Sequence, residues 1–140
     1  MADSFFEELG GMDCLERVHR IFYGKLLSHP WLKGFFEGVP RHHLESQQTD
    51  FMAGVFGGPK IYGGRPPKSA HVHLFITEEV FMIRHGLLEE SLIEAGIRPD
   101  LRKRWLGYDL RMKKVLVKSS VSECAGRYNT DPVVVVEKPC

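Results

Sequence analysis

The side chains that suggest chemistry in this sequence are its histidines, of which there are seven. Most suit the surface or a helix end, but His71 follows a Gly/Pro-rich segment at residues 57–68 and precedes the apolar run at 74–76. This order displays the imidazole from a short turn between two long helices. An imidazole held in this way suits a ligand of a metal or of haem iron. The other histidines are His19, His29, His42, His43, His73 and His85.

A second unusual feature is a set of polar side chains on otherwise apolar helix faces. Gln48 interrupts the apolar stripe of the segment 41–56, with Gln47 beside it, and Tyr23 lies one position from the stripe of the preceding helix. A buried amide or phenol without a partner costs about 1 to 3 kcal/mol. Either these groups hydrogen bond to one another, or they converge on a polar bound molecule inside an apolar pocket.

Helix start and stop signals place these residues on helices. Ser4 and Asp13 each have a glutamate three residues later, which is the capping-box pattern, so we expect helices to begin at both positions. The first ends at the glycine pair 10–11, and the second continues on an apolar stripe to Pro30. A third helix is expected at about 41–56, after a proline suited to a first helical turn.

The second half of the chain continues in the same way. Residues 57–68 contain four glycines and three prolines, which predict a loop, and residues 69–74 allow about one helical turn. We expect a helix at 77–95, with its first residue, a threonine, as the N-cap, and a last helix at 99–118. The tail at 119–140 is expected to be extended or disordered.

The overall composition limits the class of protein. The chain has 140 residues, a length typical of one domain, and a formal net charge of +1, which argues against a disordered chain and a nonspecific nucleic-acid binder. Three cysteines without metal-type spacing favour a reducing compartment. The sequence has neither a signal-peptide pattern nor a run of about 18 apolar residues. We therefore expect a soluble, cytoplasmic protein without a nucleic-acid or membrane partner.

Several segments between residues 22 and 77 together resemble one family. In combination they are similar to the truncated haemoglobins of group I, over about residues 4–118. This resemblance implies an all-α fold, a two-on-two helical sandwich that encloses one haem b, with a globin domain at 1–118 and a tail at 119–140 outside it. The matching segments are FY at 22–23, GFFEGV at 34–39, Gln48, FMAGVFGGP at 51–59, Tyr62 and KSAHVHLFIT at 68–77.

The resemblance makes His71 the proximal ligand of the haem iron. The fifth residue after it is Ile76, which matches an apolar position of the family, whereas counting from His73 gives Glu78. We therefore expect His71, and not His73, to bind the iron.

On the distal side, Tyr23 matches the tyrosine that donates a hydrogen bond to bound dioxygen, and Gln48 matches the glutamine that supports it. Such donors slow the escape of a ligand that carries partial negative charge. Leu44 stands where ordinary globins carry a distal histidine, and Gln47 where hexacoordinate relatives carry a coordinating one. We therefore expect an open sixth position, with a histidine of the pair 42–43 as the alternative internal ligand.

Arg84 departs from the family pattern, because the resemblance puts a pocket-lining apolar or aromatic residue there. An isolated buried charge is too costly, so we expect Arg84 to reach a haem propionate or solvent. The resemblance also implies further contacts with the haem. Three polar residues, His43, Tyr62 and Lys68, are candidates to face the propionates, and the other contacts are aromatic and apolar. The aromatic and apolar contacts are Phe22, Phe36, Phe51, Met52, Ile76 and Phe81.

The resemblance implies a protein, monomeric or weakly dimeric, that binds dioxygen for scavenging or sensing, with nitric oxide and carbon monoxide as further ligands. An enzymatic alternative is nitric oxide detoxification by dioxygenation to nitrate, or a peroxidase-like activity. Dioxygenation needs an external reductase, because the chain has no flavin or nicotinamide motif. A haem-free alternative is a helical adaptor with a zinc site from the histidines at 42, 43, 71 and 73, although zinc usually takes three or four convergent ligands.

Overall fold

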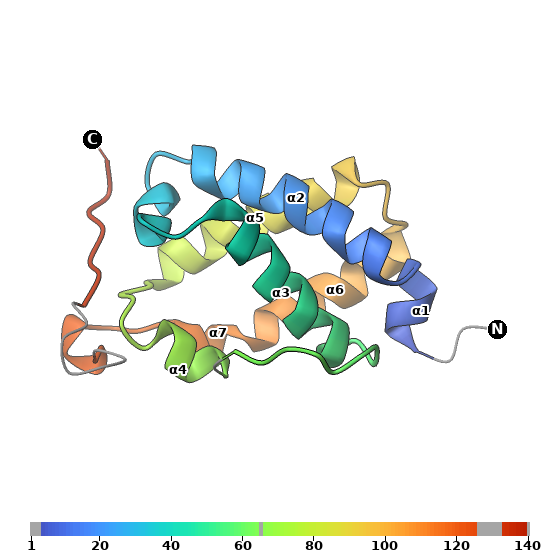
Figure 1. Cartoon of the computed structure of the whole chain (residues 1–140). Coiled ribbons are helices and arrows are strands. Elements are labelled where there is room, and N and C mark those ends of the chain that lie inside the picture. The colour runs from blue at the N-terminus through green and yellow to red at the C-terminus, as the bar shows by residue number, and fades with distance from the viewer. Residues whose placement is uncertain (1–3, 65, 126–132, 140) are drawn as a thin grey trace.

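The computed structural model describes residues 4–64, 66–125 and 133–139, which fold almost entirely into helices (Figure 1). The expected all-α fold class is confirmed. No helix in these ranges is long and apolar enough to span a membrane. The long helices are α2 (Met12–Ser28), α3 (Arg41–Val55), α5 (Glu78–Glu94) and α6 (Pro99–Arg111). The short ones are α1 (Phe5–Leu9), α4 (Pro67–His71), α7 (Lys113–Leu116) and the 3-10 turns η1 (Leu32–Phe36) and η2 (Val121–Glu123).

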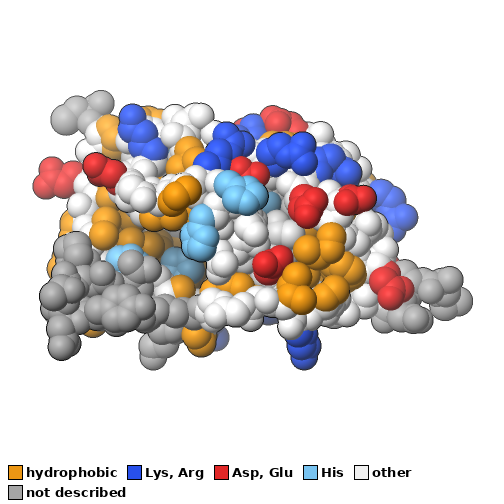
Figure 2. Space-filling view, in the orientation of Figure 1, with side chains coloured by type: hydrophobic (Ala, Val, Ile, Leu, Met, Phe, Trp, Pro, Cys, Tyr) orange, Lys and Arg blue, Asp and Glu red, His pale blue; other side chains and the backbone are white. Residues whose placement is uncertain are grey.

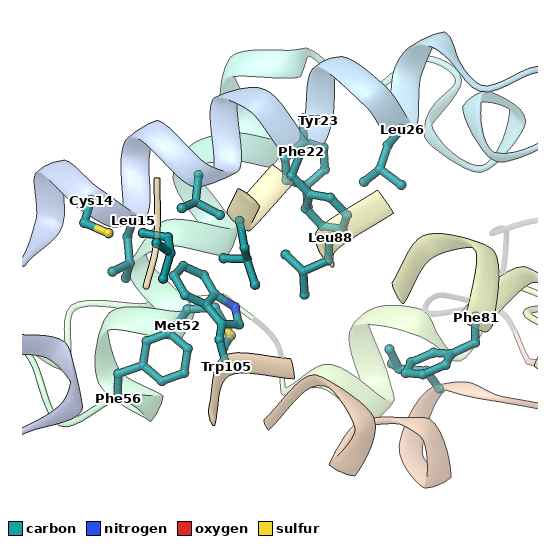
Figure 3. Close-up of a cluster of buried hydrophobic side chains, with 14 of the residues drawn as sticks. Cys14, Leu15, Phe22, Tyr23, Leu26, Met52, Phe56, Phe81, Leu88 and Trp105 are labelled. Carbon is teal, nitrogen blue, oxygen red and sulfur yellow. The ribbon is translucent and has the colours of Figure 1, made fainter. Parts of the chain in front are cut away.

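The four long helices form two pairs that pack around a shared core. α2 contacts both α3 and α5, and α5 contacts α6. Figure 3 shows Phe22 from α2 directed toward Leu88 of α5, with Trp105 of α6 nearby. Trp105 also contacts the edge of Phe56, with ring centroids 5.0 Å apart. Burial of these large apolar side chains is the main force that holds the two helix pairs together.

Local capping signals define where α1 and α5 begin. The Ser4 hydroxyl accepts a hydrogen bond from the Glu7 amide at 3.1 Å, and the Thr77 hydroxyl accepts one from the Val80 amide at 3.2 Å. Each bond satisfies one of the backbone donors that a first helical turn leaves without a partner. Both of these predicted N-caps are confirmed.

The predicted N-cap at Asp13 is wrong. α2 begins at Met12 with Gly11 as its N-cap, so Asp13 lies inside the first turn. Gly10 and Gly11 have φ angles of +103° and +80°, a region that other residues seldom adopt. These two glycines turn the chain so tightly that α2 starts before the aspartate is reached.

The last predicted helix, at 99–118, is interrupted. α6 ends at Arg111, α7 ends at Leu116, and Val117 is extended. Val117 forms a parallel bridge with Ile76, and the Lys118 amide donates to the Ile76 carbonyl at 2.8 Å. This pairing with a segment about 40 residues earlier ends the helix, and no local signal in the sequence indicates it.

Residues 133–139 run beside the segment that follows α4, at one end of the fold (Figure 1). The Val134 amide donates to the His73 carbonyl at 2.7 Å, and the Phe75 amide donates to the Val134 carbonyl at 2.9 Å. Farther along, the Trp31 indole N–H donates to the Val136 carbonyl at 2.9 Å. This segment therefore ties the chain before η1 to the chain after α4.

His19 is a polar side chain inside the core, with 1% of its surface exposed. Its Nδ1 lies 2.7 Å from the Thr49 hydroxyl, which joins α2 to α3, and its ring contacts the edge of Trp105. Burial, reinforced by the charge of Arg84, lowers the pKa of His19 to about 3. The imidazole is therefore neutral in the folded protein at every pH above that value.

The buried His19 predicts a loss of stability in acid. The unfolded chain protonates this histidine near its ordinary pKa of about 6.5, whereas the folded chain does so only near 3. Between these values the unfolded state binds more protons, so the free energy of unfolding falls as the pH falls, by up to about 1.4 kcal/mol per pH unit.

Urea denaturation followed by tryptophan fluorescence at several pH values between 3.5 and 7 measures this effect. The His19→Gln variant lacks the titrating group, so its stability should depend less steeply on pH than that of the wild type. Parallel curves for the two proteins would contradict the assignment.

Candidate functional site

His71 is the last residue of α4, and one of its ring nitrogens has a defined partner. Nδ1 lies 2.7 Å from the Pro67 carbonyl oxygen. A carbonyl oxygen can only accept, so Nδ1 carries the proton and Nε2 of the neutral ring has a free electron pair. Burial, with smaller effects of Arg84 and Lys118, lowers the pKa of His71 to about 4. His71 is therefore a neutral imidazole with the tautomer that a metal ion requires at Nε2.

Lys118 holds the C-terminal end of α4 through its side chain. Its ammonium donates to the carbonyl oxygens of His71 at 2.9 Å, Leu74 at 2.7 Å and Leu116 at 3.2 Å. The residue is 9% exposed, and loss of solvation lowers the pKa of its ammonium. From the sequence we expected only that a helix ends near Lys118. No residue close to Lys118 in the chain indicates which carbonyl oxygens its ammonium binds.

Tyr23 lies on α2 with 7% of its surface exposed, between the rings of Phe22 and Phe36. Burial raises the pKa of its hydroxyl to about 12, so the group remains a hydrogen-bond donor near neutral pH. Among the described residues, no group hydrogen bonds to this hydroxyl, and none joins it to Gln47 or Gln48. The possibility that Tyr23 hydrogen bonds to Gln47 or Gln48 is therefore not realised in this structure.

The glycine-rich loop lies against α3. The Tyr62 ring contacts the edge of Phe51, with centroids 5.2 Å apart, and burial raises the pKa of its hydroxyl. Gly64 approaches Gln47 so closely that a Cβ at this position would lie 2.7 Å from the amide oxygen. The absence of a side chain at Gly64 thus lets the loop pack beside the residues of α3 that precede Phe51.

Arg84 has a partner that the sequence did not reveal. The guanidinium of this α5 residue donates to both carboxylate oxygens of Asp109 on α6, at 2.9 and 2.8 Å. His85 Nδ1 lies 2.8 Å from the same carboxylate. Burial opposes ionisation of Asp109, but Arg84 and His85 outweigh it and hold the pKa of the carboxyl at about 2. The sequence left Arg84 with only a propionate or solvent to reach, whereas the structure supplies a counter-ion within the protein.

The other candidate residues differ in how deeply they are buried. Phe22, Met52, Ile76 and Phe81 are buried, and Figure 3 shows Phe81 apart from the other labelled side chains. Phe36, Leu44 and Gln48 are partly buried, and the side chain of Lys68 lies outside the described part of the structure.

The two adjacent histidines of α3 lie at the surface. His42 and His43 are both exposed, and Figure 2 shows histidine side chains on the surface where α3 begins. Within the described ranges, no group of three or more His, Cys, Asp and Glu side chains is arranged to hold a metal ion. The zinc alternative therefore lacks the convergent ligands that it needs.

Comparison with known proteins identifies relatives over most of the chain. The family model described as bacterial-like globin matches residues 4–116. A group 1 truncated hemoglobin of Mycolicibacterium paratuberculosis is 35% identical over 104 residues, which cover 74% of this chain and 76% of the relative. Another, from Tetrahymena pyriformis, is 35% identical over 94 residues, covering 67% of this chain and 78% of the relative.

Solved structures agree with these sequence relatives. The crystal structure of truncated hemoglobin from Tetrahymena pyriformis in its Fe(III) form superposes with a TM-score of 0.75 at 26% identity, covering 84% of this chain and all of that one. The group II truncated hemoglobin from Bacillus anthracis shares the fold, with a TM-score of 0.77 over 84% of this chain and 98% of that one, at 21% identity. The predicted family resemblance and the predicted globin sandwich are both confirmed.

The hydrogen bonds of Lys118 predict a stabilising role. Lys118→Met keeps the length of the side chain but leaves the carbonyls at the end of α4 without this donor, so the free energy of unfolding should fall by about 1 to 3 kcal/mol. Urea denaturation measures the change. Lys114→Met, at an exposed position four residues earlier, is the matched control and should leave stability nearly unchanged. Equal stability of the two variants would exclude the role.

Proposed function

The chain belongs to the bacterial-like globin family, among the group 1 truncated haemoglobins, and from this premise we propose that it is a haem b protein that binds dioxygen reversibly. Carbon monoxide and nitric oxide are the further ligands of this proposal. The observation that carries it is the hydrogen bond from His71 Nδ1 to the Pro67 carbonyl, which leaves Nε2 free to bind iron.

The residues of the chain suit a haem better than a bare metal ion. A haem needs one neutral imidazole from the protein and an apolar environment for its ring. His71 is neutral, and the aromatic residues Phe22, Phe36 and Phe81 are buried or partly buried. When bound, the haem would supply the iron that takes up the diatomic molecule.

The residues of the chain would then have distinct tasks. His71 would hold the iron, and the neutral hydroxyl of Tyr23 would donate a hydrogen bond to the ligand, with support from Gln48. The high pKa of Tyr23 favours this role, because the donor proton is retained across the physiological pH range. Leu44 and Gln47 would leave the sixth position open, since neither is a good iron ligand.

The remaining proposed contacts would hold the haem itself. Phe51, Met52 and Ile76 would add apolar contacts. His43, Tyr62 and Lys68 would face the propionates, where their N–H, O–H and ammonium groups suit a carboxylate. A Soret absorption band in the purified protein, present after haem is added and absent before, tests the proposal directly. A protein that fails to take up haem would refute it.

The identity of the iron ligand predicts which histidine is needed to retain haem. His71→Ala should release haem to apomyoglobin at least tenfold faster than the wild type, because the bond from the protein to iron is lost. His73→Ala, two residues away, is the matched control and should retain haem nearly as well as the wild type. The transfer is followed by the change in Soret absorbance. The opposite ranking would move the ligand to His73.

The donor role of Tyr23 predicts a faster loss of dioxygen when its hydroxyl is removed. Tyr23→Phe should raise the dissociation rate of dioxygen at least tenfold, since a hydrogen bond to a partly charged acceptor is worth about 1.5 to 3 kcal/mol. Stopped-flow displacement by carbon monoxide measures this rate. Tyr108→Phe, which alters a phenol packed between Phe5 and Phe56, should leave the rate unchanged. An unaltered rate in Tyr23→Phe would remove it from the distal site.

A further inference from the structure

The guanidinium of Arg84 is a cation inside the helical sandwich. Its Cζ lies 5.5 Å from the ring centroid of Phe22 and 5.4 Å from that of Phe81. Phe22 is in turn 5.6 Å from the ring of Tyr23. Arg84 is thus held among the aromatic side chains that the proposed function assigns to the haem and its ligand. The side chain of Arg84 is 18% exposed, so a small molecule can reach it.

Asp109 fixes the guanidinium in one orientation. Two parallel N–H bonds of 2.9 and 2.8 Å to the two carboxylate oxygens leave the planar group little rotational freedom. The His85 ring binds the same carboxylate and stacks against Phe81, so the acceptor is itself held. The cation therefore does not need to be ordered when a ligand arrives, and a pre-organised donor binds at a lower entropic cost.

The charge of Arg84 acts on neighbouring groups of the interior. It lowers the pKa of His19 further and opposes the larger rise that burial causes in the pKa of Tyr23. Arg84 also lowers the pKa of His71. Although the pair as a whole is neutral, its cation lies against the rings of Phe22 and Phe81 and is fixed by Asp109, so the pair forms an oriented dipole.

Arg84 has hydrogen-bonding capacity left over. A guanidinium carries five N–H donors, and Asp109 occupies two of them. Among the described residues, no other acceptor bonds to Arg84. A cationic donor of this kind is satisfied best by an anion, because hydrogen bonds between charged partners are roughly twice as strong as neutral ones.

We propose that Arg84, fixed by Asp109, is a specificity residue that favours small anionic ligands, such as azide and nitrite, in the ligand pocket of the ferric protein. This inference rests on the proposed function, since it requires haem in the interior lined by Phe22 and Phe81. The neutral hydroxyl of Tyr23 serves neutral ligands, whereas Arg84 adds a preference that depends on ligand charge. The Arg84 cation attracts an anion more strongly in this poorly solvated interior than it would in water.

The central experiment compares azide affinity in the haem-loaded ferric protein at pH 7, by titration of the Soret band. Arg84→Met removes the cation but leaves Asp109 with only His85 as its partner, so the double variant Arg84→Met/Asp109→Asn is measured as well. Its two neutral side chains avoid an unpaired buried carboxylate. We expect both proteins to bind azide about tenfold to a hundredfold more weakly than the wild type. Carbon monoxide is a neutral ligand, so the ferrous forms of the wild type and of both variants should bind it with affinities within about threefold of one another.

A matched control and a spectroscopic measurement separate this role from a structural one. Arg104 on the same helix as Asp109 is exposed and pairs with Glu8, so Arg104→Met should leave azide binding unchanged. In the ferrous carbon monoxide form, the positive charge should lower the C–O stretching frequency by drawing electron density onto the ligand. The infrared band of the double variant should therefore lie at higher frequency than that of the wild type.

The outcomes distinguish this inference from the proposed function. Wild-type affinity for azide in the double variant would overturn the inference, because a weaker affinity in Arg84→Met would then come from the charge of Asp109, which has lost its counter-ion. An unshifted C–O band in the double variant would also overturn it. In either case, a normal Soret band would leave the proposed function intact. Failure of the wild type to take up haem would refute the proposed function itself.

Discussion

His71 lies at the end of a helix that is too short to be stable by itself. The five residues of α4 form few internal hydrogen bonds, and isolated helices need about 12 residues or more to persist in water. Distant parts of the chain therefore hold α4. Lys118 binds carbonyl oxygens at its end, and Val134 pairs with the chain that follows it. The direction of the imidazole, and any chemistry at its Nε2, depends on these contacts.

The interior of the fold keeps its ionisable groups in defined states. Burial leaves Tyr23 protonated and keeps His19 and His71 neutral near pH 7. Arg84 and Asp109 stay charged, since each provides the counter-charge that makes burial of the other tolerable. The result is a largely apolar interior that contains neutral donors and acceptors together with an oriented ion pair. Such an environment strengthens electrostatic interactions with any ligand that enters it.

The interior of the fold holds two hydrogen-bond donors of different kinds. Tyr23 is a neutral donor suited to polarised but uncharged ligands, and Arg84 is a cationic donor suited to anions. A ferrous centre would use mainly the first, and a ferric centre the second. Ligand preference in this chain would then change with the oxidation state of the iron without any movement of the helices. The globin frame alone does not produce this property, because it depends on the pairing of Arg84 with Asp109.

Signals that act over a few residues were readable in the sequence. The caps at Ser4 and Thr77 and the display of His71 after a Gly/Pro loop depend on neighbours within one helical turn or one loop. Membership of the globin family followed from the combination of such local motifs. The tertiary structure alone decided that Asp109 neutralises Arg84 and that Lys118 supports α4. These partners lie 25 and 47 residues from the groups they bind, and only the packing of the folded helices brings them within hydrogen-bonding distance.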